Sequence, residues 1–514
     1  MQRGRGLPLP RYLLNMYFPK PAPLHLPRVI LVLTLLGIYL STLAPGVTWA
    51  NNGSDGGDLI SAAYTGGIPH PTGYPTYLII ARFFQWMPVG SLAYRTNLLS
   101  ALATTLTALL AYELVAQTLR HRGVTGASFA ALIAGFAFGV SPLAWSQAVI
   151  TEVYALQSLL IALILLLFIH PPKLDRQGLD RLRGLFMGLA VGSHLTTALL
   201  FPLLFFPGSW DIADTPEPRQ PDTKRPASSL IRKLVWLAFG LSIYLTLPLR
   251  ALTNPPVNWG KPVTLERFWW LVSGELYRSY YLQFQLEGIG ERTQAWASLL
   301  LDQFGLIGVL LAVAGLVIAF KPSRLYFYTI WIGAAFSIFS ILYSTADSYV
   351  YLIPVSLSFA VWLGLGVGLI LEKAPPDARV VQWGMGLLVL SCFAIRAFGY
   401  AGEVDASRDL RAERFGRQVM SEVPKDALVF VKGDEAVFTV WYFHFALGER
   451  PDLAVIAEEL LHFDWYQETL RDSYPGLAVP GPFPWAQNIA DANPAHPVCR
   501  VQYADRAEIE CGSR

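Results

Sequence analysis

Charged residues and cysteine are both scarce in this sequence, and each scarcity excludes a class of protein. Only 15% of the 514 residues are charged, and 39 Lys and Arg residues face 37 Asp and Glu residues, which gives a net charge of +2. A nucleic-acid-binding protein would carry a clear basic excess. Three cysteines are too few for a disulfide scaffold, and only Cys499 and Cys511 lie close enough along the chain to pair.

Several familiar catalytic motifs are missing as well. The sequence has no GxxxxGK[ST], which speaks against a P-loop ATPase, and no HExxH or GxSxG, which gives no support to a zinc protease or an α/β-hydrolase. Its cysteines show no spacing typical of a metal site, so we expect no metal centre.

Apolar residues, in contrast, are abundant and come in long runs. They make up 53% of the chain, and the mean hydropathy is +0.40. Such runs cross a bilayer core of about 30 Å as helices. The sequence therefore predicts an α-helical polytopic membrane protein with about 10–11 transmembrane helices. The runs lie at about 29–46, 97–119, 127–146, 153–170, 184–206, 234–250, 303–320, 325–344, 349–371 and 381–398.

The distribution of basic residues predicts the topology. A basic segment, 1–28, precedes the first run and favours a signal anchor with a cytoplasmic N-terminus in the plasma (inner) membrane. The loops 47–96 and 251–302 then lie outside. A single crossing at 184–206 conflicts with the basic linker 207–233, so that run is either two short half-crossings or a re-entrant hairpin.

The sequence thus divides into three parts. The cytoplasmic segment 1–28 is followed by a transmembrane domain, 29–401. Residues 402–514 have ordinary charge density and strand-like runs at 427–433 and 453–459, which predict a small extracytoplasmic α/β domain.

Polar residues of interest follow the first apolar run. Asp55 and Asp58 are placed to take a proton from a hydroxyl and to orient an acceptor, but they also fit the N-cap and N3 positions of a helix. His70, in the Pro- and Gly-rich turn 70–75, is either a functional side chain or an incidental imidazole. The stretch 76–90 predicts an amphipathic helix at the membrane interface.

Four more polar residues lie within or beside apolar runs. Glu152 and Asp347 are expected at the outer ends of spans, where an acid can line a cavity. The alternative for Glu152 is exposure to the lipid headgroups, and the alternative for Asp347 is to cap a helix. His194 either lines a polar cavity or bonds to a neighbouring helix. Arg250 either binds a phosphate or snorkels to the headgroups.

Several short blocks occur together and carry a resemblance. They are D-x-G-[DE]-L and HP-x-GYP in the first loop, YR-x-NLLSAL (94–102), W-x-Q…EVYAL (145–156), GSH (192–194), NP-x-x-NWG-x-P (254–262), D-x-Y-x-x-x-P (347–354) and GD…WY…G-x-RPD (433–452). In this order they resemble the protein O-mannosyltransferase-like membrane proteins of the GT-C glycosyltransferases. Thr72 departs from the common HPPGYP, and the family often has an acid at the position of Lys261.

The resemblance implies a GT-C fold and a sugar donor carried on a polyprenyl phosphate, with no other cofactor. It places Asp55 and Asp58 in catalysis. Residues implied in binding donor or acceptor are His70, Tyr74, Arg95, Glu152, His194, Arg250, Asn258, Trp259 and Asp347.

The expected reaction is an inverting, metal-independent transfer with Asp55 as general base. A sugar, with mannose favoured, would pass from the polyprenyl phosphate to a hydroxyl of a protein Ser/Thr or a cell-surface glycan. The expected partners are the lipid-linked sugar, this acceptor and membrane lipid, and no nucleic acid. A secondary transporter and a non-catalytic membrane scaffold are the alternatives.

Overall fold

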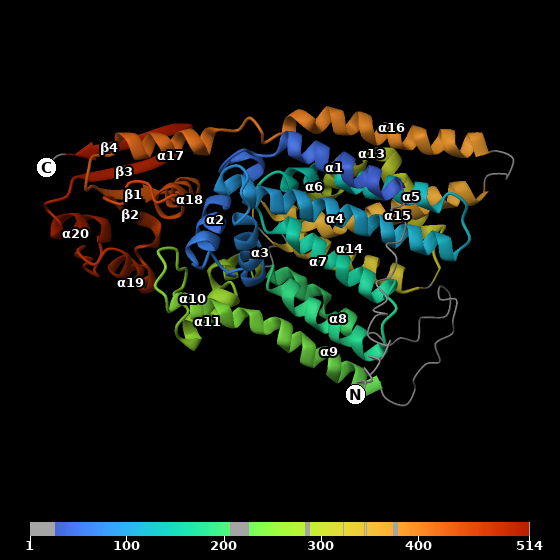
Figure 1. The fold of residues 1–514 in the computed structure, drawn as a ribbon, viewed down its shortest axis with the longest axis horizontal. Coiled ribbons are helices and arrows are strands. Elements are labelled where there is room, and N and C mark those ends of the chain that lie inside the picture. Colours follow the sequence, from blue (N-terminus) through green and yellow to red (C-terminus); the bar gives the residue numbers. More distant parts are fainter. Residues whose placement is uncertain are drawn as a thin grey trace, which may run out of the picture.

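The computed structural model describes residues 26–205, 226–282, 288–321, 323–343, 345, 347–373 and 379–512. Most of the predicted N-terminal segment, 1–25, and most of the basic linker, 207–225, lie outside these residues. The described chain forms a helical bundle and a C-terminal domain, which lie side by side along the long axis of the molecule (Figure 1).

The bundle contains the predicted spans. Among the described residues, six helices are long and apolar enough to cross a membrane, and one bent pair makes a possible seventh. Each predicted apolar run falls on helical structure, so the predicted polytopic helical fold is confirmed. The predicted number of about 10–11 transmembrane helices is larger than the six or seven that are long and apolar enough, because the helices Leu26–Thr42, Tyr154–Ile169 and Leu195–Leu204 are shorter. The elements are α1 (Leu26–Thr42), α4 (Leu92–His121), α5 (Ala127–Gly139), α6 (Pro142–Ala148), α7 (Tyr154–Ile169), α8 (Arg176–Val191), η3 (Leu195–Leu204), α9 (Pro226–Leu241), η5 (Ser242–Leu245), α10 (Thr246–Ala251), α13 (Ile289–Val317), α14 (Arg324–Leu342), η7 (Ser348–Leu352), α15 (Ile353–Lys373) and α16 (Arg379–Val404).

Two of the predicted runs are broken. The run 127–146 bends by 65° between α5 and α6, because Pro142 begins the second helix and cannot donate a backbone hydrogen bond to the first. The run 184–206 breaks at residues 192–194, between α8 and the 3₁₀ helix η3. The sequence predicted the second break, whereas the prediction of one continuous helix over 127–146 was wrong.

Two loop regions connect the spans at the end of the bundle that faces the C-terminal domain (Figure 1). The first loop region, residues 43–91, contains η2 (Ala50–Asn52), α2 (Gly56–Thr65) and α3 (Pro75–Gln85). The second loop region, residues 252–282, contains α11 (Leu265–Val272), η6 (Glu275–Tyr277) and α12 (Arg278–Leu282). The predicted loop 251–302 contains these elements and also the partly polar first turns of α13, which begins at Ile289.

The helices α8 and α9 pack through glycine. A Cβ atom added to Gly184 would clash with the carbonyl oxygen of Lys233, and one added to Gly188 would lie 2.5 Å from that of Leu237. Small residues at such a contact let two membrane helices approach backbone to backbone. This glycine seam therefore fixes the position of α9 along α8.

The C-terminal domain is the predicted α/β unit. Its four-stranded sheet has the order β2-β1-β3-β4, with β4 antiparallel to β3 and the other pairs parallel. Cys499 and Cys511 lie opposite each other on β3 and β4 and form a disulfide. The elements are α17 (Arg411–Glu422), β1 (Leu428–Lys432), α18 (Asp434–Trp441), η9 (Tyr442–Ala446), β2 (Ala454–Ala457), η10 (Glu458–Leu460), α19 (Asp464–Ser473), α20 (Trp485–Ala492), β3 (Val498–Ala504) and β4 (Arg506–Gly512).

Candidate active site

The centre of the site is a buried pair formed by Asp58 and His70. Asp58 lies in the first turn of α2 and is fully buried. Its Oδ2 atom accepts a hydrogen bond from the backbone N–H of His70 at 2.9 Å and lies 2.8 Å from the ring atom Nδ1. Its Oδ1 atom accepts a bond from the indole N–H of Trp259 at 3.3 Å. Both oxygens of Asp58 are thus occupied, Oδ2 by His70 of the same loop region and Oδ1 by Trp259 of the second loop region, so Asp58 does not complete a capping box.

His70 faces a second carboxylate on its other side. Its Nε2 atom lies 3.6 Å from Oδ2 of Asp55 and 3.1 Å from the hydroxyl of Tyr74, which donates to the carbonyl of Pro71. Burial lowers the pKa of His70, but Asp55 and Asp58 outweigh this effect and raise the pKa to about 9. The imidazole is therefore a fixed cation at neutral pH, and the turn holding it is not incidental.

Asp55 is the more accessible of the two acids. It occupies the N-cap position of α2, as one interpretation of the sequence predicted, but its side chain makes no capping hydrogen bond. About a third of that side chain, 36%, is exposed, whereas Asp58 is covered. Of this pair, only Asp55 can meet an incoming hydroxyl.

Glu152 and His194 lie beside the same cluster. Glu152, between α6 and α7, is buried and interacts electrostatically with Asp55 and His70. His194 lies in the break before η3, where its Nδ1 atom accepts a hydrogen bond from the backbone N–H of Thr196. Its ring packs against Tyr74 and, at 5.5 Å and 5.6 Å between centroids, against Tyr154 and Tyr351. The bundle thus lines one side of the site with aromatic rings.

The segment around Asn258 closes the site from the second loop region. Backbone bonds join Ile68 to Val257 and Trp259, so the two loop regions pair like short parallel strands. The amide of Asn258 is buried, and neither of its polar atoms has a partner among the described residues. The guanidinium of Arg250 donates to the carbonyl of Gly67, next to Ile68 of this pairing, at 3.3 Å. An unpaired buried amide is costly and is therefore a strong candidate to bind a ligand hydroxyl.

Arg95 and Asp347 differ from this group. The guanidinium of Arg95 donates to the backbone carbonyls of residues 85, 89 and 90, so it stabilises the end of α3 rather than facing the cluster. The expectation that it binds substrate is not supported by this geometry. Asp347 is exposed at the start of η7, makes no capping bond, and interacts electrostatically with Glu152.

The C-terminal domain supplies groups that the sequence interpretation missed. The ring of Phe438 on α18 lies 6.4 Å from that of His70 and nearly parallel to it. A Cβ atom on Gly57 would clash with the carbonyl of Phe438, so α18 packs directly on α2. Burial raises the pKa of Asp434 to about 6, and the charge of Asp55 adds to this rise. In the sequence, only the Gly433-Asp434 pair of the shared blocks indicated that the C-terminal domain contributes to the site.

An ionic clamp holds the second loop region to the C-terminal domain. Arg267 donates through both terminal nitrogens to Glu468 at 2.8 Å, and Lys261 lies 2.7 Å from Asp472 and 3.4 Å from Glu468. Lys261 is thus paired with two carboxylates of the C-terminal domain. We call these four residues of loop and α19 the α11–α19 clamp.

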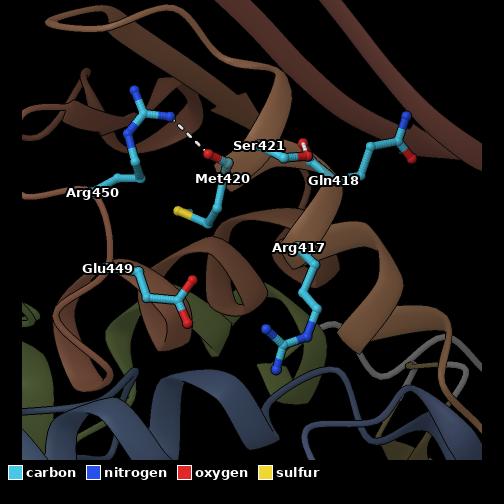
Figure 2. A pocket seen from close by; sticks show the side chains of 6 residues that line it. All are labelled: Arg417, Gln418, Met420, Ser421, Glu449 and Arg450. Carbon is cyan, nitrogen blue, oxygen red and sulfur yellow. Dashed lines mark hydrogen bonds between the residues drawn. The ribbon is translucent and has the colours of Figure 1, made fainter.

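A separate open groove of about 670 Å³ lies on the C-terminal domain (Figure 2). Its lining includes Arg417, Glu449 and Arg450, and Arg450 donates to the carbonyl of Met420. None of the residues predicted for the site lines this groove.

Family models match two parts of the chain. Residues 55–209 match the Protein O-mannosyl-transferase TMEM260 N-terminal domain, and residues 412–507 match the TMEM260-associated domain 2. The first match begins at Asp55 and contains His70, Glu152 and His194; the second contains Asp434 and Phe438.

Two relatives carry the name protein O-mannosyl-transferase TMEM260. The mouse protein (Mus musculus) is 25% identical over 457 residues, which is 84% of this chain, and the Dictyostelium discoideum protein is 21% identical over 519 residues, which is 88% of it. The chain spans only 62% and 60% of the lengths of these relatives.

Solved structures share the fold. ArnT from Cupriavidus metallidurans, bound to undecaprenyl phosphate, has a TM-score of 0.58 at 14% identity, with 93% of each chain covered. An Archaeoglobus fulgidus oligosaccharyltransferase has a TM-score of 0.53 at 12% identity, with 92% of this chain and 68% of that chain covered. Two family models and two relatives thus make the chain similar to the protein O-mannosyl-transferase TMEM260 proteins, and the solved structures show that it shares the fold of GT-C glycosyltransferases.

Proposed function

We propose that this protein is an inverting glycosyltransferase that moves a sugar, mannose being favoured, from a polyprenyl phosphate to a hydroxyl of a protein Ser/Thr or a cell-surface glycan. One observation carries the proposal: the partly exposed Asp55 faces a cationic His70 that the buried Asp58 holds in place. The names of the relatives support mannose and a protein acceptor. The undecaprenyl phosphate bound to ArnT, which has a similar fold, supports a polyprenyl-phosphate donor.

In the proposed reaction Asp55 acts as general base. It takes the proton of the acceptor hydroxyl, and the oxygen attacks the anomeric carbon from the face opposite the phosphate. The bond between the anomeric carbon and the phosphate oxygen breaks, and the polyprenyl phosphate leaves with the bonding electrons. The configuration at the anomeric carbon is therefore inverted.

The other residues position and stabilise these groups. His70 stabilises the carboxylate of Asp55 and, with Arg250, offers positive charge to the departing phosphate. Asp58 acts through His70, which it orients, and does not contact the reacting atoms. The unpaired amide of Asn258 is suited to a hydroxyl of the sugar or the acceptor.

The reaction would take place on the outer side of the membrane. Disulfides persist in oxidising compartments, and the Cys499–Cys511 disulfide lies in the domain that packs on the site. This supports the predicted extracytoplasmic position of the two loop regions and the C-terminal domain, with the N-terminus in the cytoplasm of a plasma-membrane protein.

We also propose that the transfer needs no divalent metal. Asp55 and Asp58 are three residues apart, whereas the two acids of the DxD motif that often holds a divalent ion in other glycosyltransferases are two apart. In addition, protein donors already occupy both oxygens of Asp58. Activity that survives EDTA would support this part, and activity restored only by added Mg²⁺ or Mn²⁺ would contradict it.

Transfer of labelled sugar tests the main proposal. Purified wild type and Asp55→Asn would be incubated in detergent with synthetic polyprenyl-phosphate mannose, glucose and arabinose, with membrane extract as the acceptor pool. Incorporation of label by the wild type and its loss in the variant would support the proposal. No incorporation with any donor would contradict it and favour a transporter, which sugar uptake into proteoliposomes would then detect.

A further inference from the structure

The helix α11 has two different faces. Leu265 and Trp269, one helical turn apart, are 82% and 66% exposed. On the opposite face Leu271 is fully buried. A large leucine and a tryptophan side by side on an open surface are costly in water, so this exposed ridge needs an apolar or interfacial environment. We call Leu265 and Trp269 the α11 ridge.

The α11 ridge continues a surface that already faces lipid. The candidate span Ala227–Ala251 is only 28% buried in its most apolar window, and Leu249 and Leu252 near its end are 65% and 67% exposed. Figure 1 shows α10 and α11 next to each other, at the end of the bundle that meets the C-terminal domain. Trp is typical of this level of a bilayer, where its ring meets both acyl chains and headgroups.

The amphipathic helix α3 lies at the same end of the bundle (Figure 1). Phe83 and Trp86 expose 65% and 68% of their surfaces there. Exposed aromatic residues on α11 and at the end of α3 thus lie at the same end of the bundle, as expected for elements that meet a membrane surface.

The inner face of α11 supports the candidate site. A Cβ atom added to Gly73, in the turn that holds His70, would lie 3.3 Å from Leu271, and one added to Gly260, next to Trp259, would lie 3.2 Å from the ring of Trp270. Arg267 of the same helix belongs to the α11–α19 clamp. A shift of α11 would therefore move both turns of the site and the C-terminal domain.

We infer that α11 is a membrane-docking helix whose Leu265–Trp269 ridge inserts into the leaflet at the domain-bearing end of the bundle. Lipid on the outer face of α11 and the two turns on its inner face then hold the site at a fixed height above the acyl chains. A donor anchored by a polyprenyl chain would meet the site at this height, a consequence that rests on the proposed function.

Spin-label accessibility tests the docking without reference to activity. In a Cys392→Ser background that keeps the disulfide, single labels would be placed at Leu265→Cys and Trp269→Cys in full-length protein reconstituted in phosphatidylcholine–phosphatidylglycerol nanodiscs. Leu249→Cys provides a lipid-facing reference. Phe483→Cys, an apolar residue of the C-terminal domain that is 76% exposed, provides a matched control.

Labels on the α11 ridge should favour oxygen over a water-soluble nickel chelate, as the label at 249 does. The docking is overturned if they match the label at 483, which would place the ridge in water. It is equally overturned if neither reagent reaches them, which would mean that a second copy or another protein covers the ridge.

A kinetic arm connects the docking to the proposed function. The double variant Leu265→Ser/Trp269→Ser should raise KM severalfold for a long-chain donor in vesicles and leave KM for a short-chain, water-soluble donor unchanged. An equal rise for both donors would overturn the link. If the wild type transfers no sugar at all, the proposed function fails, while the label result still decides the docking.

Discussion

The carboxylate of Asp58 binds His70 twice, through the backbone N–H and at the ring atom Nδ1, and the Asp58 side chain is fully buried. A buried carboxylate that accepts from both the backbone and the ring fixes the place and the orientation of the imidazole together. The second nitrogen of the ring is thereby directed toward Asp55 and Tyr74. The accessible acid of the site depends on the buried one.

Stability should fall as pH rises through the range in which His70 titrates. Its pKa is raised from 6.5 to about 9, so its contribution is complete below about 6.5 and is lost as the pH approaches 9. Thermal unfolding in detergent between these two values should therefore show a falling midpoint. Asp58→Asn should lower the midpoint and flatten this dependence, while Glu422→Gln, on the exposed surface of α17, should do neither. An unchanged slope in Asp58→Asn would exclude the pair as its source.

Replacing the accessible acid should affect the rate more than the fold. Asp55→Asn keeps the size of the side chain and removes the base, so kcat should fall by about 10²- to 10⁴-fold with little change in the unfolding midpoint. Initial rates of sugar transfer and a melting curve of the same sample check this. Full activity in Asp55→Asn would remove it from the mechanism.

The α11–α19 clamp should respond to charge reversal. Arg267→Glu and Glu468→Arg should each loosen the contact between the second loop region and the C-terminal domain, and the double swap should restore part of it. Because both side chains are partly exposed, we expect a coupling energy of only about 1 kcal/mol, weaker at high salt. Protease susceptibility of the domain provides the measurement. Additive single effects would mean that the two residues act independently.

Removing the disulfide should weaken the C-terminal domain. A short closed loop of this kind typically contributes about 2–4 kcal/mol, so Cys499→Ala/Cys511→Ala should unfold at a lower denaturant concentration than the wild type. Unfolding followed with and without reductant provides the check, because reductant should lower the stability of the wild type and leave the double variant unchanged. Cys392→Ala, which leaves the disulfide intact, is the matched control.

Patterns of local composition predicted much of the fold. The apolar runs predicted the helices, and the strand-like runs predicted β1 and β2. The conflict between the basic linker 207–233 and a single crossing at 184–206 predicted that this run is broken. The break at Pro142 was missed, although Ser141-Pro142 is a known helix boundary signal, because apolar composition continues across it.

The site was predictable only in part. Asp55, His70, Glu152 and His194, which the sequence singled out from separate segments, lie in one cluster in the structure. The role of Phe438 depends on its contact with His70, which is far away in the sequence. The role of Arg95 depends on which backbone carbonyls lie within reach of its guanidinium. No spacing rule contains that information.

The glycine seam between α8 and α9 has a consequence at the opposite end of the span. Backbone contact at Gly184 and Gly188 opposes sliding of α9 along α8. If α11 docks on the membrane as inferred, its height is then set by this contact when the bilayer becomes thinner or thicker. The membrane itself must deform, at an energetic cost that grows with each ångström of hydrophobic mismatch. The match between the protein and its membrane then depends on the acyl-chain length of the lipids, and the best-matched length depends on the contact at Gly184 and Gly188.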